Sequence, residues 1–262
     1  MSDSSGLAGR AAVVTGGGRG VGAEVARLLA ADGASVLVAA RTSSEIERVA
    51  MELRAAGANV SSTTCDVSDP GAVDRLATCA REALGRIDIL VNNAGVATAA
   101  PLSRTTLEEW NRIMAINATG AFLCMRAFLP GMLERRWGRV VSVASTLALT
   151  GYRYTAAYTA SKHALLGLTR AVAAEAAAHG VTVNAICPSY LDTRMTEETL
   201  TRITARTGRS REEALEAVTG QNPQKRLIAP QEVAAAVVYL CSDAAASVNG
   251  AALVIDGGEL RR

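Results

Sequence analysis

Three side chains in the middle of the 262-residue chain have the types and spacing for acid–base chemistry at a carbonyl or hydroxyl group. Tyr158 and Lys162 are four residues apart, so on a helix they share one face. An ammonium group beside a phenol stabilises the phenolate, and we therefore expect a lowered pKa at Tyr158 that brings its proton transfer near neutrality. Ser145 follows an expected strand at 139–144, where its hydroxyl could hold a substrate oxygen beside Tyr158.

A glycine-rich turn near the N-terminus indicates a nucleotide site. Residues 15–22 read TGGGRGVG and join an expected strand at 11–15 to an expected helix at 21–32. Glycines allow the tight turn and the close approach of the backbone to a pyrophosphate, which binds at the helix N-terminus. Because this turn lies in the first strand–helix connection of an alternating pattern, it predicts a dinucleotide site rather than a simple tight loop.

The end of the second expected strand, at 35–40, bears on the choice of cofactor. Arg41 follows this strand, and no acidic residue occurs between Gly33 and Glu45. Sites that prefer NAD usually place a carboxylate here, whereas an arginine accommodates the 2′-phosphate of NADP. Arg19 and Arg41 are therefore a candidate clamp for that phosphate, and two solvated arginines are the alternative. The pattern predicts NADP(H) as the preferred cofactor, with NAD(H) as the second choice.

Two further turns add candidate cofactor contacts. Asp66 follows the third expected strand, and its carboxylate could accept a hydrogen bond from an adenine amino group. Residues 92–95 read NNAG and follow the fourth expected strand, where small side chains would let a cofactor lie against the strand ends.

Strand and helix patterns alternate from residue 10 to residue 256 without a linker. The expected strands are 11–15, 35–40, 59–64, 87–91, 139–144, 181–186 and 252–256, and the expected helices are 21–32, 43–56, 70–84, 105–136, 155–179 and 230–242. This order predicts one α/β domain over 1–262, with a doubly wound, seven-stranded parallel sheet. Residues 192–222 are polar and threonine-rich, which predicts an inserted pair of surface helices that acts as a lid, or else a surface loop.

Composition excludes several classes of protein. Hydrophobic residues make up 49% of the chain and the formal net charge is +2, which argues against disorder and against nucleic-acid binding. The longest stretch without a charged residue is 16 residues at 176–191, too short and too interrupted to span a bilayer. The N-terminus lacks a signal-peptide pattern, and the five cysteines show neither paired nor metal-site spacing. We expect a cytoplasmic protein with reduced thiols and no metal site.

Taken together, these motifs resemble the short-chain dehydrogenase/reductase family along the full length of the chain. The matching residues are the turn at 15–22, Asp66, the NNAG sequence at 92–95, Asn117 within NATG, Ser145, Tyr158 with Lys162, Pro188, Thr193 and the closing 256–258. The resemblance implies a Rossmann fold and a catalytic group formed by Asn117, Ser145, Tyr158 and Lys162.

The roles implied by the resemblance are specific. Tyr158 would donate or accept the proton, Ser145 would orient the carbonyl oxygen, Lys162 would bind the nicotinamide ribose and depress the tyrosine pKa, and Asn117 would hold a relay water. The implied cofactor contacts, together with Tyr158 and Lys162, are Gly16, Gly18, Arg19, Gly20, Val21, Gly22, Arg41, Asp66, Val67, Asn93, Ala94, Gly95, Pro188, Leu191 and Thr193. One departure is Ser189, because the family usually has glycine after this proline, and the local cofactor wall should differ.

The sequence indicates the substrate less directly than it indicates the cofactor. The carboxyl-terminal third resembles 3-hydroxybutyrate dehydrogenases, which recognise a free carboxylate, but the aligned positions here are Ala97, Leu147 and Thr155. None is charged, which argues against a small free acid. Lys225 at the base of the lid could contact an anion or could be a solvated lysine.

Residues 146–157 are apolar and aromatic, which favours a bulky ketone. Carrier-protein-dependent reductases of the family use basic residues near the active-site mouth. Arg136 falls on one such position, and His179 stands where a second arginine is expected.

We therefore expect an NADPH-dependent reductase of a 3-oxoacyl thioester, on coenzyme A or a carrier protein, or of a ketide-like ketone. The alternatives are an NAD(P)-dependent secondary-alcohol or 3-hydroxyacid dehydrogenase working oxidatively, and a non-catalytic nucleotide sensor. The family is usually tetrameric, and the small residues Ala164, Gly167, Ala171 and Ala174 could line a helix contact between subunits or pack on the chain's own sheet. No nucleic acid or membrane partner is expected.

Overall fold

A seven-stranded parallel sheet forms the centre of the protein in a computed structural model that describes residues 6–260. The strands are β1 (Ala11–Thr15), β2 (Ser35–Ala40), β3 (Val60–Thr64), β4 (Ile89–Asn92), β5 (Gly138–Val143), β6 (Val181–Pro188) and β7 (Ala252–Ile255). Their order is β3-β2-β1-β4-β5-β6-β7, and every neighbouring pair is parallel. All seven predicted strands are confirmed to within two residues at each end. Chain order reverses between β1 and β4, and sheets of this kind bind ligands outside the carboxyl ends of the strands at that reversal.

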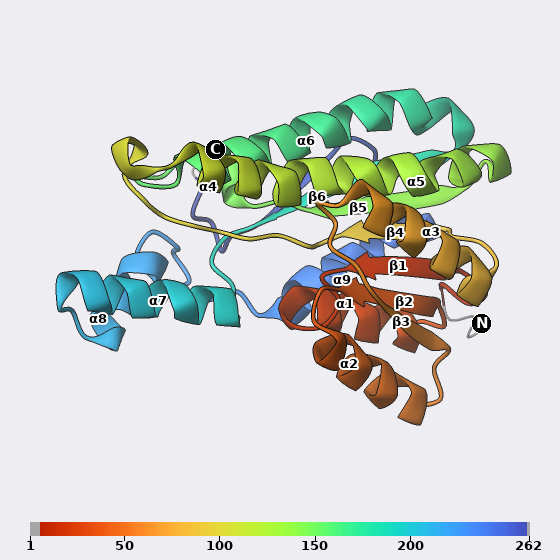
Figure 1. The fold of residues 1–262 in the computed structure, drawn as a ribbon, viewed down its shortest axis with the longest axis horizontal. Helices are drawn as coiled ribbons and strands as arrows, with labels where there is room; N and C mark the ends of the chain where they lie inside the picture. The colour runs from red at the N-terminus through yellow and green to blue at the C-terminus, as the bar shows by residue number, and fades with distance from the viewer. Residues whose placement is uncertain (1–5, 261–262) are drawn as a thin grey trace.

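Helices cover both faces of the sheet, so the fold is the predicted doubly wound α/β type (Figure 1). They are α1 (Gly20–Ala31), α2 (Ser43–Ala55), α3 (Pro70–Leu84), α4 (Leu107–Met114), α5 (Gly120–Arg135), α6 (Ala156–Ala176), α7 (Arg194–Thr207), α8 (Arg211–Thr219) and α9 (Pro230–Cys241). Helices α1, α2 and α9 share one hydrophobic cluster, and α3, α5 and α6 share another.

Strand β2 shows why these runs are apolar throughout. Val36 and Val38 pack into the cluster of α1, α2 and α9, whereas Leu37 and Ala39 pack into the cluster on the opposite face. A strand that is buried on both faces cannot alternate with polar residues. The five cysteines all lie in the described part of the chain and form no disulfide, and four of them are buried, as predicted.

The predicted helical stretch at 105–136 is confirmed over Leu107–Arg135, but it is not α-helical throughout. A π-helical segment, Ala115–Thr119, separates α4 from α5. A hydrophobic pattern does not reveal such a turn, because the residues on either side remain helical. By length and composition alone the segment Leu107–Arg135 could cross a membrane, but half of its most apolar window is buried inside the fold. Core helices of globular proteins have the same composition.

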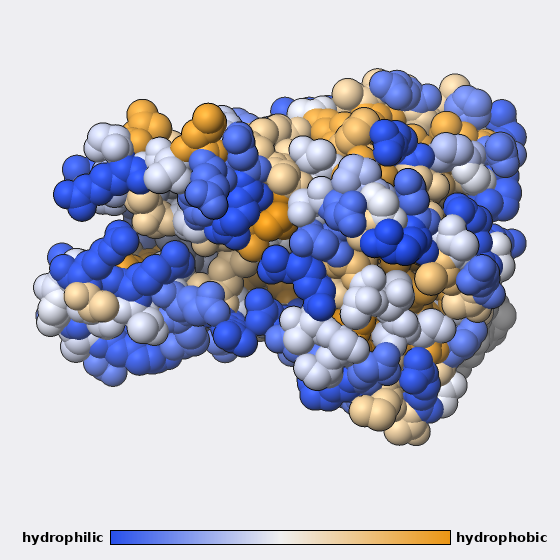
Figure 2. All heavy atoms as spheres, viewed as in Figure 1, coloured by the Kyte–Doolittle hydropathy of each residue, from blue (hydrophilic) through white to orange (hydrophobic). Residues whose placement is uncertain are grey.

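The polar segment at 192–222 forms the predicted pair of helices, α7 and α8, which stand apart from the sheet (Figure 1). Ser210 begins α8 with a capping box, in which its hydroxyl accepts from the backbone of Glu213 and the Glu213 carboxylate accepts in return. Leu200, Ala214 and Val218 form a small separate core beneath the pair. Hydrophilic side chains cover these helices, and a hollow opens between them and the part of the fold that carries α4 (Figure 2).

Candidate active site

One pocket of about 540 Å³ lies along the carboxyl ends of the strands. Its volume is typical of a site for a cofactor or small molecule. Loops after six strands contribute to it, together with α7. The predicted residues that line it are Gly16, Gly18, Arg19, Gly20, Val21, Arg41, Asp66, Val67, Asn93, Ala94, Gly95, Ser145, Tyr158, Lys162, Pro188, Leu191 and Thr193. Two predicted site residues, Gly22 and Asn117, do not line it.

Gly22 serves the packing of the glycine-rich turn rather than the pocket wall. A Cβ atom there would lie 2.2 Å from the backbone oxygen of Gly16 and 2.5 Å from Nδ2 of Asn93. Asn93 Nδ2 donates to the backbone oxygens of Thr15 and Gly16, at 3.0 and 3.1 Å. The Thr15 hydroxyl in turn accepts from the backbone nitrogens of Asn93 and Ala94. The fourth strand therefore ties the first turn in place, and only glycine fits between them.

The two arginines of the candidate clamp both line the pocket but differ in their partners. Arg41 lines the pocket and is exposed, but the Arg19 guanidinium forms an ion pair of 3.2 Å with Glu45, which also lines the pocket. This ion pair depends on the tertiary structure, because the N-terminal end of α2 places Glu45 beside the glycine-rich turn. Asp66 lies near Arg41, and its pKa is lowered mainly because Ser68 donates hydrogen bonds to Oδ1.

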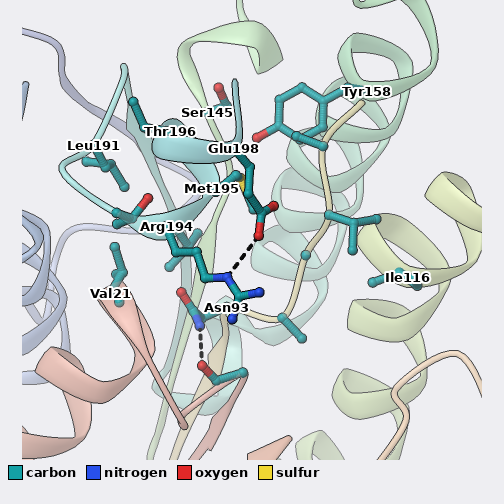
Figure 3. A pocket seen from close by; sticks show the side chains of 18 of the residues that line it. Val21, Asn93, Ile116, Ser145, Tyr158, Leu191, Arg194, Met195, Thr196 and Glu198 are labelled. Atoms are coloured by element: carbon teal, nitrogen blue, oxygen red, sulfur yellow. Dashed lines mark hydrogen bonds and ion pairs between the residues drawn. The ribbon is translucent and has the colours of Figure 1, made fainter. Parts of the chain in front are cut away.

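Ser145, Tyr158 and Lys162 come together where β5 ends and α6 begins. Ser145 and Tyr158 both line the pocket and face it (Figure 3). Lys162 is 4% exposed, and its ammonium donates to the backbone oxygen of Val143 at 2.9 Å. The same Nζ atom lies 5.7 Å from the centre of the Tyr158 ring. The helical spacing thus places acid and cation on one face, as predicted.

The expected lowering of the tyrosine pKa is wrong for the chain by itself. Burial raises the pKa of Tyr158 to about 12, although the nearby Ser145 hydroxyl favours the phenolate and opposes this change. Burial also lowers the pKa of Lys162 to about 8. Removing charged groups from water disfavours both the phenolate and the ammonium. The site therefore holds a protonated phenol at neutral pH.

Asn117 lies behind the pocket wall, inside the π-helical segment. Its Nδ2 donates to the backbone oxygen of Val96 and to the hydroxyl of Ser161, both at 2.9 Å, and its Oδ1 accepts from the backbone nitrogen of Val96. A Cβ atom on Gly95 would lie 3.3 Å from Asn117 Oδ1 and 3.6 Å from Lys162 Nζ. Asn117 is thus adjacent to Lys162 and separated from the pocket by Gly95.

The unusual Ser189 has a partner at the end of the chain. Its hydroxyl donates to the carboxylate of Glu259, and the other oxygen of that carboxylate accepts from the hydroxyl of Tyr152. Asp256 holds the same tail by accepting from the backbone nitrogens of Gly258 and Leu260, both at 2.8 Å. Ser189, which stands where the family usually has glycine, therefore links the pocket wall to the carboxyl-terminal tail.

Several pocket residues escaped sequence analysis. They are Glu45, Arg112, Tyr190, Arg194, Met195, Glu198 and Arg202, among others. Arg194, Glu198 and Arg202 are spaced four residues apart, which is a helical signal within the polar segment that could have been used. Arg194 pairs with Glu198 at 2.9 Å (Figure 3).

The residues considered for substrate recognition divide into two groups. Ala97, Leu147 and Thr155 line the pocket as expected. Lys225 does not line it: this lysine is exposed, and its ammonium donates to the backbone oxygen of Gly220. Its reading as an anion contact is therefore wrong in this structure.

The prediction that Arg136 and His179 lie at the active-site mouth is wrong within one chain. Arg136 follows α5 and precedes β5, and its guanidinium donates to the backbone oxygen of Ala178, next to His179. Both residues therefore lie at the amino ends of the strands, opposite the edge that carries Ser145. Within one chain they are not at the pocket mouth.

The small-residue face of α6 points to solvent. Gly167, Ala171 and Ala174 are exposed and Ala164 is half-buried, so this face does not pack on the chain's own sheet. A Cβ atom on Gly167 would have no neighbour within 4 Å.

Known proteins with this sequence pattern align over nearly the whole chain. D-beta-hydroxybutyrate dehydrogenase of Cupriavidus necator is 36% identical over 253 residues, which are 96% of this chain and 98% of the relative. The 3-oxoacyl-(acyl-carrier-protein) reductase of Vibrio cholerae is 35% identical over 252 residues, again 96% and 98% of the two chains.

Comparison with solved structures points to the same group of enzymes. A variant of actinorhodin polyketide ketoreductase, solved with NADPH, has a TM-score of 0.92 and 37% identity over 95% of this chain and 97% of that one. The family model described as short chain dehydrogenase matches residues 10–203. With this pocket, this sheet order and these motifs, the chain belongs to the short-chain dehydrogenase family.

Proposed function

We propose that the protein uses NADPH to reduce a ketone to a secondary alcohol, and that the ketone is a 3-oxoacyl thioester or a related ketide. The observation that carries this proposal is the position of Tyr158. Tyr158 lines the same pocket as Ser145 and the glycine-rich turn. With a pKa of about 12, the phenol keeps its proton at neutral pH and can donate it. Proton donation belongs to the reductive direction.

The residues present fit such a cofactor. The glycine-rich turn and the N-terminus of α1 face the pocket and would hold the pyrophosphate, and Arg41 would bind the 2′-phosphate. When bound, NADPH supplies the hydride. Ser145 donates a hydrogen bond to the carbonyl oxygen of the substrate, and Tyr158 passes its proton to that oxygen. Lys162 holds the nicotinamide ribose, and its charge stabilises the phenolate that remains.

Asn117 has a supporting role in this proposal. Its Oδ1 accepts one hydrogen bond, from Val96, and so keeps a second lone pair that can hold a water. That water would return a proton toward Lys162, whose ammonium lies on the same side of Gly95.

The choice of ketone rests on the lining of the pocket and on the names of two relatives. Ala97, Leu147 and Thr155 bring no charge to the substrate region. The names 3-oxoacyl-(acyl-carrier-protein) reductase and polyketide ketoreductase support a ketide carbonyl. The relative named D-beta-hydroxybutyrate dehydrogenase supports the second candidate, oxidation of a 3-hydroxyacid with NAD(P). A non-catalytic sensor is disfavoured because Asn117, Ser145, Tyr158 and Lys162 are all present.

NADPH consumption with a panel of ketones tests the proposal. Tyr158→Phe should abolish turnover while NADPH binding, followed by fluorescence, stays within about twofold, because only the hydroxyl is lost. Arg41→Ala should raise the KM for NADPH by about 10-fold or more and leave the KM for NADH unchanged, because only NADPH carries the 2′-phosphate. Appreciable activity of Tyr158→Phe would contradict the role of Tyr158 as proton donor. Faster turnover by the wild type with NADH than with NADPH would contradict the cofactor assignment.

Two further proposals concern the whole molecule. Helix α7 contributes several pocket residues, which supports a lid over the substrate, and its amide hydrogen exchange should slow when NADPH and a ketone analogue bind. The exposed Gly167, Ala171 and Ala174 support a homotetramer with α6 at a subunit contact. Light scattering that finds a stable monomer would remove this second proposal. We place the enzyme in the cytoplasm.

A further inference from the structure

Five arginines line the pocket, and they differ in their partners. Arg19 pairs with Glu45, Arg112 pairs with Glu109, and Arg194 pairs with Glu198. Within residues 6–260, the other two, Arg41 and Arg202, have no carboxylate partner. Arg41 follows β2 and is already assigned to the 2′-phosphate of the cofactor. Arg202 is the one that the proposed reaction does not yet use.

Arg202 is held in place by neutral groups of its own helix. Its Nε donates to the backbone oxygen of Glu198 and its Nη2 to the hydroxyl of Thr199, both at 3.1 Å. A guanidinium has five N–H donors, so three remain without a partner among the described residues. Arg202 is also half-buried, whereas the other four pocket arginines are exposed. A fixed, partly desolvated fork with unused donors suits a carboxylate or phosphate.

Arg202 lies on α7, whose Leu200 belongs to the small core against which Tyr190 packs. Its positive charge acts on Tyr190, whose raised pKa it partly lowers, and burial is the main cause of that raised pKa. Tyr190 in turn acts on the pKa of Tyr158. All three side chains line the same pocket. Arg202 therefore lines the part of the pocket formed by α7 and Tyr190, whereas Arg41 follows β2 and lines the pocket near Asp66.

We propose that Arg202 binds an anionic oxygen group of the substrate, either the carboxylate of a 3-oxoacid or a phosphate of a coenzyme A thioester. The inference rests on the proposed ketone reduction. It revises the expectation drawn from Ala97, Leu147 and Thr155, because the cation comes from α7 and not from the strand-edge loops that carry those residues. Binding of an anion would also draw α7 onto the substrate, since Arg202 is fixed to that helix.

The test compares three substrates that share one ketone: acetoacetate, acetoacetyl-coenzyme A and the neutral acetoacetyl thioester of N-acetylcysteamine. Arg202→Gln should raise the KM of the matching charged substrate by about 10- to 100-fold, with kcat within about twofold and the neutral thioester unchanged. Arg202→Lys should restore part of the loss, because it keeps the charge without the fork. Arg209→Gln removes one exposed arginine just beyond α7 and should have no effect on any of the three.

The pattern of losses identifies the source of the anion. A loss confined to acetoacetate assigns a carboxylate, and a loss confined to acetoacetyl-coenzyme A assigns a phosphate. Equal losses with all three substrates would make Arg202 a structural residue and overturn the proposal, as would no loss with either charged substrate.

A binding measurement separates this inference from the proposed function. If the wild type reduces none of the three ketones, the proposed substrate class fails, and calorimetry with NADPH-loaded protein then decides the role of Arg202. Acetoacetate or coenzyme A should bind the wild type, and Arg202→Gln should weaken that binding by about 10-fold or more. Absence of binding to the wild type by both probes, or equal binding to the variant, would overturn the proposal.

Discussion

Lys162→Met removes a buried ammonium group, and we expect it to abolish turnover without destabilising the fold at neutral pH. The pKa of Lys162 is about 8 in the folded protein, because burial disfavours the ammonium, against 10.5 for an ordinary lysine. At about 1.4 kcal/mol for each pH unit between two pKa values, burying the charge costs about 3 kcal/mol at pH 7. Loss of the hydrogen bond to Val143 offsets about 1–3 kcal/mol of this.

The pH dependence gives the sharper measurement. Because the folded pKa lies below the unfolded one, the cost is complete below pH 8 and declines as the pH rises from 8 to 10.5. The stability gained by Lys162→Met over the wild type should therefore shrink by about 2–3 kcal/mol between pH 7 and pH 10. The hydrogen-bond contribution is present at both pH values and largely cancels in this difference.

The chain provides its own control, since Lys162 and Lys225 are its two lysines. Urea unfolding of Lys162→Met, Lys225→Met and the wild type at pH 7 and pH 10 measures the free energies directly. Lys225 is exposed, and its replacement should produce no comparable change with pH. With lysine Cε labelled by ¹³C, two side-chain signals report the titrations. If Lys162→Met changed the free energy of unfolding by the same amount at both pH values, the reasoning would be refuted. Titration of Lys162 above pH 10 would refute it as well.

Two further substitutions test the framework of the site. Gly22→Ala should lower the melting temperature and abolish NADPH binding, because its Cβ atom would overlap the backbone of the glycine-rich turn at 2.2 Å. Gly71→Ala in α3, where a Cβ atom would come no closer than 3.4 Å to its nearest neighbour, Arg75 Nη1, should instead leave the stability within about 1 kcal/mol of the wild type; similar melting curves for Gly22→Ala and Gly71→Ala would contradict this account. Glu259→Gln should speed hydrogen exchange at 256–260 and raise the KM for the ketone a few-fold, because its carboxylate accepts from Tyr152 and Ser189. Unchanged hydrogen exchange at 256–260 would contradict the idea that the Glu259 carboxylate holds the carboxyl-terminal tail in place.

Much of the fold was predictable because it depends on short stretches of sequence. Each strand is an apolar run flanked by turn residues, and burial on both faces makes the run recognisable without knowledge of its neighbours. Tyr158 and Lys162 are also a local pair, four residues apart on α6, so their common face followed from spacing. The π-helical segment at Asn117 escaped prediction because its neighbours remain helical.

Pairings between distant residues were not predictable in this way. Arg19 meets Glu45 across 26 positions, and Tyr152 meets Glu259 across 107. Arg202 reaches the pocket only because α7 stands over the carboxyl edge of the sheet. Nothing in the local sequence around these side chains indicates their partners.

By itself, then, the sequence determined the order of strands and helices, the glycine-rich turn and the group of Ser145, Tyr158 and Lys162. Only the tertiary structure decided how these groups titrate and which charges they meet. The sign of the Tyr158 pKa change shows the reason most clearly. Spacing predicts a neighbouring cation that lowers the pKa, but burial raises it to about 12, and burial is a property of the whole packed fold.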